Sequence, residues 1–121
     1  MSLKRVLMTM ARNPGFPNGD SRYGYEFIAP LTPDGRLDAG AWEAVEAKCT
    51  VRHFEPGKDD ENGMLVLDED RWFFDYNQDF DADDEPLFKL DKHIMLEGEY
   101  ITVTEHDRKQ RAFQIVSVRP A

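Results

Sequence analysis

Hydrophobic and polar residues alternate along several short runs of this chain, with the period of two that is typical of a β-strand. In residues 23–28, the aromatic side chains of Tyr23, Tyr25 and Phe27 fall on one face. Comparable runs occupy positions 3–11, 49–54, 64–67, 72–76, 100–104 and 113–118, and residues 100–104 are rich in β-branched and aromatic residues. The pattern therefore predicts a protein built mostly from short strands.

A helical pattern occurs once, between residues 39 and 48. Ala41, Trp42 and Val45 share one face of that stretch, and Asp38 stands where an N-cap residue is expected. Gly40 lowers the helical propensity, so we expect two or three turns. The sequence thus predicts one short helix that packs over the sheet or plugs an open end.

These elements predict one compact domain over residues 1–121, because a chain of this length supports one hydrophobic core. We expect a mainly β fold, a small antiparallel barrel or a highly curved sheet of about six or seven strands with one short helix. Residues 64–67 with 72–76, and 100–104 with 113–118, read as hairpins. The alternative is an α+β fold whose helix packs on one face of an antiparallel sheet.

Charge is distributed unevenly along the chain. The protein has a formal net charge of −9, which argues against nucleic-acid partners and against anionic membrane surfaces. Residues 55–91 contain fourteen acidic and three basic residues, so this segment alone carries −11. The leading hypothesis is a non-enzymatic binding module that presents this acidic face to a basic protein partner or a cationic ligand. The residues expected to contact that partner are Asp59, Asp60, Glu61, Asp83, Asp84 and Glu85.

A calcium site is the second hypothesis, because carboxylates recur at every second position of one predicted loop. Ca²⁺ takes six to eight oxygen ligands at short range. The EF-hand pattern fails, since Asp84 stands where that loop needs glycine and Leu90 where it needs glutamate. The candidate ligands are Asp79, Asp81, Asp83 and Glu85; otherwise no cofactor is expected.

A small enzyme or small-molecule-binding barrel is the third hypothesis, with an aromatic-lined pocket among Tyr23, Tyr25, Trp72 and Tyr76. The sequence singles out no catalytic residue, because none of its histidines forms a ligand pair and nothing marks a base beside Cys49. Cys49 is the single cysteine, which fits a reducing compartment, and no apolar run is long enough to span a bilayer. We therefore expect a cytoplasmic protein.

Overall fold

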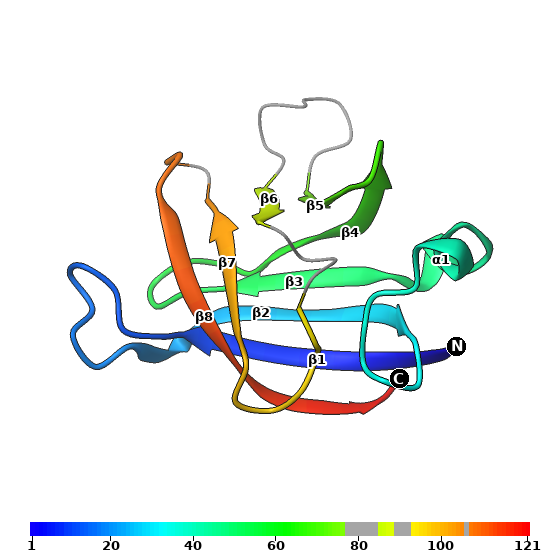
Figure 1. Ribbon diagram of the computed structural model, residues 1–121. Coiled ribbons are helices and arrows are strands. Elements are labelled where there is room, and N and C mark those ends of the chain that lie inside the picture. Colours follow the sequence, from blue (N-terminus) through cyan, green and yellow to red (C-terminus); the bar gives the residue numbers. More distant parts are fainter. Residues whose placement is uncertain (77–84, 89–92, 106) are drawn as a thin grey trace.

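In the described part of the chain, eight antiparallel strands form one sheet that closes on itself, because the first strand pairs with both the second and the last. The computed structural model describes residues 1–76, 85–88, 93–105 and 107–121, and each strand lies beside its neighbour in sequence (Figure 1). The strands are β1 (Ser2–Met10), β2 (Asp20–Leu31), β3 (Thr50–Phe54), β4 (Glu61–Asp68), β5 (Arg71–Asp75), β6 (Glu85–Phe88), β7 (Tyr100–Thr104) and β8 (Gln110–Pro120).

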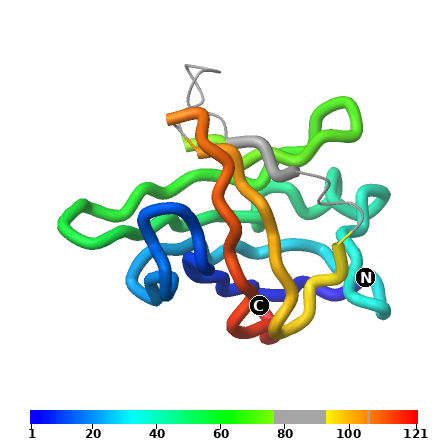
Figure 2. Tube along the Cα trace, turned by 60° about the vertical axis from the view of Figure 1, so that its left-hand side comes forward, coloured from blue at the N-terminus to red at the C-terminus, as the bar shows by residue number. Residues whose placement is uncertain are grey.

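The predicted mainly β fold with one short helix is confirmed. The strand beyond the expected six or seven is β6, a short segment with two paired positions on each side. The sheet is strongly curled, and in Figure 2 the orange-to-red β7–β8 hairpin runs across the blue-to-green strands. Register shifts in β1, between Leu7 and Met8 and between Thr9 and Met10, contribute to this curvature.

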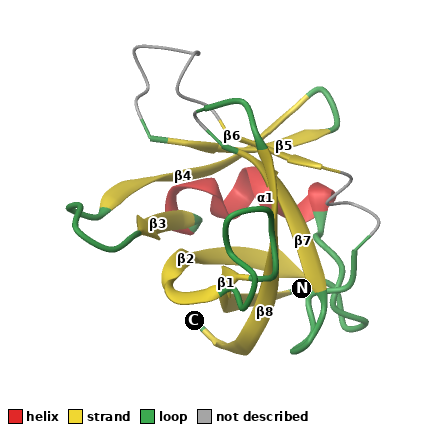
Figure 3. Ribbon diagram, turned by 90° about the vertical axis from the view of Figure 1, so that its left-hand side faces the viewer, coloured by secondary structure: helices red, strands yellow, loops and turns green. Residues whose placement is uncertain are grey.

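The helical segment consists of α1 (Ala39–Val45) followed by one 3₁₀ turn (Glu46–Lys48), as the sequence predicts. The Asp38 side chain accepts a hydrogen bond from the amide of Ala41 at 3.1 Å, which makes Asp38 the N-cap. Trp42 attaches the helix to the sheet, since its indole Nε1 donates to the carbonyl of Leu65 at 3.0 Å. Figure 3 shows α1 behind the strands, at one end of the barrel. None of the helices in the described parts of the chain is long and apolar enough to cross a membrane.

The interior of the barrel is filled by side chains. Residues at alternate positions of each long strand point inward and are buried, which gives the strands their period-two pattern. Among the largest fully buried side chains are Tyr25, Phe27, Phe74, Phe113, Met8, Leu65 and Ile101. Rings from facing strands contact one another, as Tyr25 does with Phe74 at a centroid distance of 5.1 Å. The core is therefore a packed aromatic cluster.

Candidate functional site

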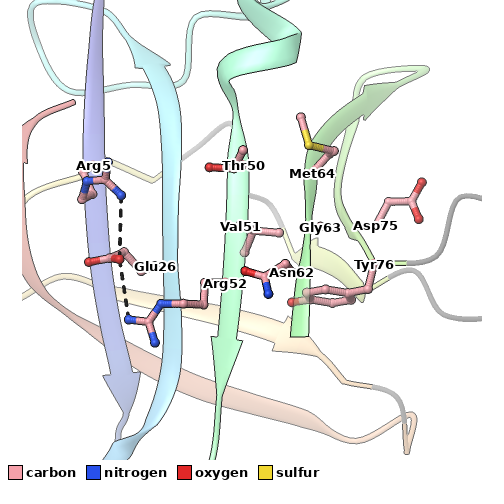
Figure 4. A pocket seen from close by; sticks show the side chains of 10 residues that line it. All are labelled: Arg5, Glu26, Thr50, Val51, Arg52, Asn62, Gly63, Met64, Asp75 and Tyr76. Carbon is pink, nitrogen blue, oxygen red and sulfur yellow. Dashed lines mark ion pairs between the residues drawn. The ribbon is translucent and has the colours of Figure 1, made fainter. Parts of the chain in front are cut away.

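A pocket with a volume of about 580 Å³ opens on the outer face of the sheet, over β1 to β5. Figure 4 shows its walls, with β1 and β2 on one side and β4 and β5 on the other. Most residues of the walls have polar side chains, and the complete set is Arg5, Glu26, Thr50, Val51, Arg52, Asn62, Gly63, Met64, Asp75 and Tyr76. We call this hollow the outer pocket.

Two arginines share one carboxylate in the outer pocket. Glu26 pairs with Arg52 across β2 and β3, and Figure 4 shows its carboxylate between the two guanidinium groups. Glu26 Oε1 lies 3.8 Å from Arg5 Nη1 and 3.6 Å from Arg52 Nη2. Arg52 also contacts Asp60 Oδ2 at 3.0 Å and lies over the ring of Phe54, 4.7 Å from its centroid. Arg52 is therefore held on several sides.

The opposite wall depends on a close approach between two backbones. A β-carbon on Gly63 would lie 2.3 Å from the carbonyl oxygen of Asp75, so only glycine fits there. This contact brings Asp75 and Tyr76 against β4 at the edge of the pocket (Figure 4). Among the described residues, Asp75 Oδ1 is shielded from solvent and has no hydrogen-bond partner. A carboxylate oxygen in that condition carries a desolvation penalty.

Behind the outer pocket, inside the barrel, lies a buried group of polar side chains centred on Glu105. Glu105 is 5% exposed and follows the end of β7. Tyr23 donates to both of its oxygens at 2.9 and 2.8 Å, and Tyr25 donates to Oε2 at 2.7 Å. Arg111 Nη1 donates to Oε1 at 2.8 Å and also binds Asp107 through both terminal nitrogens. We call these residues the Glu105 cluster.

His53 joins the Glu105 cluster from β3 and is 4% exposed. Its Nδ1 lies 2.9 Å from the carbonyl oxygen of Gly24, and its ring stacks on Tyr25 with centroids 4.3 Å apart. Since a carbonyl oxygen accepts hydrogen bonds, Nδ1 carries a proton in this arrangement. Nε2 faces two carboxylates, Glu55 Oε2 at 3.9 Å and Glu105 Oε2 at 4.0 Å.

Electrostatics in this region follow from burial and from the charged partners. Burial raises the pKa of the Tyr23 hydroxyl well above its ordinary value, and the hydrogen bond to Glu105 raises it further. Burial works to raise the pKa of Glu55, but the hydrogen bond and charge of Lys58, whose Nζ is 2.7 Å away, lower it overall.

Burial raises the pKa of the Cys49 thiol to about 11. A thiol in this state is a poor nucleophile at neutral pH.

The Glu105 cluster has the features of an internal polar network that stabilises the fold. Its central carboxylate receives hydrogen bonds from three side chains, and charge balance comes from Arg111. In the described part of the chain, no three His, Cys, Asp or Glu side chains lie close enough to hold a metal ion. The outer pocket is therefore the better candidate for contact with another molecule.

The described part of the acidic segment 55–91, which was expected to present one face to a partner, is divided by the fold. Asp59, Asp60 and Glu61 lie at the β3–β4 connection and are exposed, whereas Asp68 to Asp70 lie at the opposite end of β4. The two groups are separated by the length of an eight-residue strand, roughly 24 Å. Asp79, Asp81, Asp83 and Asp84 lie outside the described residues, and Glu85 is described only as the first residue of β6. The calcium hypothesis therefore remains a prediction.

The four aromatic residues proposed to line a ligand pocket have different positions. Tyr25 and Trp72 are buried in the core, at 0% and 3% exposure. Tyr23 and Tyr76 are half-buried at its edge, and Tyr76 also lines the outer pocket. Tyr23 and Tyr25 both donate hydrogen bonds to Glu105. Trp72 instead packs against Trp42 of the helix, with ring centroids 6.4 Å apart. The structure thus brings three of the four near His53 and leaves Trp72 elsewhere.

Several residues of both sites were not identified from the sequence. Arg5, Glu26 and Arg52 stand at ordinary outward-facing positions of predicted strands, and their proximity depends on strand register. One signal for the Glu105 cluster does exist. Glu105 continues the inward-facing positions of Ile101 and Val103, so a charged residue there indicates a buried carboxylate that needs partners. No protein-family model, curated protein or solved structure matches this chain.

Proposed function

We propose that this protein is a non-enzymatic binding module that holds a basic segment of a partner protein in the outer pocket. The observation that carries the proposal is the carboxylate of Asp75, a residue of the pocket wall, with one oxygen that is shielded from solvent and has no hydrogen-bond partner among the described residues. A carboxylate in this state gains more from a nearby cation than a fully hydrated carboxylate does.

The other charges of the pocket support a cationic ligand. Arg5 and Arg52 are already paired with Glu26, and Arg52 is paired with Asp60 as well. Asp75, in contrast, is a charged residue of the pocket wall that forms no ion pair with any described residue. Exposed Asp59 adds negative charge near the β4 wall, and the net charge of −9 attracts basic partners over a longer range. A lysine or arginine side chain of the partner would be attracted by this negative charge.

A binding role is also supported by the state of the groups that an enzyme would need. Tyr23, Tyr25 and Arg111 use their polar atoms on Glu105, so these groups stabilise the barrel from within. The Cys49 thiol is buried and has a raised pKa. We further propose a cytoplasmic location, which rests on this lone cysteine and is tested by its redox state in cells.

Binding can be tested by recording amide NMR spectra while a short peptide is added. Three peptides share a glycine–serine background and differ at one central position, which is lysine, glutamate or alanine. We expect the lysine peptide to shift the amide signals of Asn62, Gly63 and Tyr76, and the other two peptides to leave them in place. Absence of a lysine-specific shift at these residues would contradict the proposal.

A pair of matched variants separates the pocket from general charge attraction. Asp75→Asn and Asp59→Asn each remove one negative charge, but Asp75 alone lines the pocket. We expect Asp75→Asn to weaken lysine-peptide binding by about tenfold, the loss of one charge-assisted hydrogen bond. Asp59→Asn should change binding by less than about twofold and only at low salt. Equal effects of the two variants would indicate non-specific attraction.

A further inference from the structure

Two arginines face each other directly at the β1 side of the outer pocket. Arg5 on β1 is the register partner of Arg119 on β8, so both side chains emerge on the same outer face. Arg5 lines the pocket, and Arg119 is exposed beside it. Like charges directly opposite on neighbouring strands destabilise a sheet, so this pair has a cost in the absence of an anion.

In the described structure, Glu26 compensates this positive charge only in part. Arg119 makes no ion pair or side-chain hydrogen bond with any described residue. Arg5 has a single ion pair, to Glu26 at 3.8 Å, and Glu26 is shared with Arg52. The β1 side of the pocket is therefore positive and the β5 side, at Asp75, is negative.

The span between these two ends sets the length of a ligand that contacts both. From β1 to β5 there are four strand-to-strand steps of about 4.8 Å, or roughly 19 Å along the sheet. An extended peptide advances about 3.3 Å per residue, so about six residues cover that distance. Asn62 and Thr50 lie between the ends and offer an amide and a hydroxyl to a peptide backbone.

We infer that the occupant of the outer pocket is an extended segment of a partner protein with an acidic residue at the Arg5–Arg119 end and a basic residue, about five positions away, at the Asp75 end. This inference rests on the proposed function and adds an anion subsite to it. Paired guanidinium groups suit a carboxylate because each offers a planar fork of donors. The protein's net charge of −9 disfavours a polyanion such as nucleic acid.

The test compares four labelled hexapeptides by fluorescence anisotropy. One has aspartate and lysine at opposite ends, a second has the same composition with the two charges adjacent, and two carry lysine alone or aspartate alone. We expect the first to bind about threefold to fivefold more tightly than lysine alone, as one partly exposed ion pair allows. The adjacent-charge peptide should bind like lysine alone, because it cannot reach both ends.

Variants assign the gain to the arginine pair. Arg119→Gln should remove the gain of the first peptide and leave the lysine peptide unaffected, whereas Arg12→Gln, which removes one exposed charge from the Ala11–Gly19 loop, should preserve the gain. Thermal unfolding checks that both variants fold, and Arg119→Gln should be at least as stable as the parent because it relieves like-charge repulsion.

The outcomes distinguish this inference from the proposed function. If the lysine peptide binds through Asp75 but the spaced peptide gains nothing, the anion subsite is wrong and the proposed function stands. If neither peptide binds, both are wrong. The inference is also wrong if the peptide with aspartate alone binds as tightly as the peptide with aspartate and lysine at opposite ends. It is equally wrong if inorganic phosphate displaces that two-charge peptide at equal concentration. In either case the site binds an isolated oxyanion and not an extended segment.

Discussion

Tyr25 donates a hydrogen bond of 2.7 Å to Glu105, across the interior of the barrel from β2 to the end of β7. Both residues are buried, and the bond joins positions 80 residues apart in the sequence. Because a buried carboxylate is costly unless it is fully hydrogen-bonded, this contact and those from Tyr23 and Arg111 are what make Glu105 compatible with the interior.

The first prediction concerns the stability that Glu105 provides. Glu105→Leu removes the acceptor that Tyr23, Tyr25 and Arg111 share inside the barrel, so we expect a loss of about 3–5 kcal/mol in the free energy of unfolding. Tyr25→Phe removes one donor and should cost about 1–2 kcal/mol. Asp107→Asn, at an exposed partner of the same arginine, should cost under about 1 kcal/mol. Urea denaturation measures all three, and a neutral Tyr25→Phe would contradict the assigned role.

The second prediction concerns the β4–β5 turn. Glu69 and Asp70 connect the paired residues Asp68 and Arg71 and have φ angles of 48° and 67°. Two consecutive positive φ angles define a type I′ turn, for which asparagine followed by glycine is preferred. We expect Glu69→Asn with Asp70→Gly to raise the free energy of unfolding by about 1–2 kcal/mol.

Charge removal must be separated from backbone relief in that experiment. The control is Glu69→Gln with Asp70→Ser, which removes the same two charges and retains side chains that disfavour a positive φ. Thermal and urea unfolding of the three proteins should place this control close to the parent. If it is as stable as the Asn–Gly variant, repulsion among the acidic residues at this turn, and not the backbone, limits stability.

Local patterns predicted the strands, but one local rule misplaced a strand end. The alternating pattern of residues 23–28 ends before Pro30, yet β2 continues to Leu31 and Pro30 pairs with Leu3. The carbonyl of Pro30 points away from β1 and accepts from the amide of Asp38. The nitrogen of a strand residue points to the same side as its carbonyl, so the missing N–H removes nothing from the β1–β2 ladder.

Closure of the sheet and the two sites depended on contacts between distant positions. Residues such as Lys4 and Pro120 become neighbours when β1 pairs with β8, and no local pattern encodes that pairing. The outer pocket depends on the register that sets Glu26 opposite Arg52, because a shift by one residue would turn one of them inward. The sequence therefore predicted which residues face inward, and could not predict which charged residues meet.

The third prediction concerns alkaline pH. Burial raises the pKa of Cys49 from its ordinary value of 9.0 to about 11, and burial with the Glu105 hydrogen bond raises that of Tyr23 above its ordinary value of 10.0. Above these ordinary values the unfolded chain loses protons that the folded chain keeps, so unfolding becomes easier as pH rises. The stabilisation is fully present below about pH 9 and declines above it.

Urea unfolding at a series of pH values from about 8 to about 11 measures this effect. Cys49→Ala should flatten the decline that begins near pH 9, and Tyr23→Phe the part that begins near pH 10, whatever each variant does to stability at neutral pH. An unchanged slope in both variants would show that other groups titrate there. A flatter slope for Cys49→Ala would show that the Cys49 thiol has a raised pKa in the folded protein, which is typical of a buried and unreactive thiol.

The last prediction concerns the acidic segment 77–85, whose candidate ligands lie outside the described residues except for the backbone of Glu85. A ligand that binds only the folded state stabilises it by about 2.7 kcal/mol at a hundred-fold excess over Kd. A site of sub-millimolar affinity would thus raise the melting temperature clearly at ~10 mM Ca²⁺, and Mg²⁺ would act less because it gives up water reluctantly. We expect Ca²⁺ to raise the melting temperature no more than NaCl of equal ionic strength does, because the segment lacks both the turn glycine and the closing glutamate of an EF-hand loop.

The deciding comparison is with the variant that carries Asp81→Asn and Asp83→Asn. A calcium-specific shift that this variant abolishes would establish a metal site and place it ahead of the outer pocket as the functional centre.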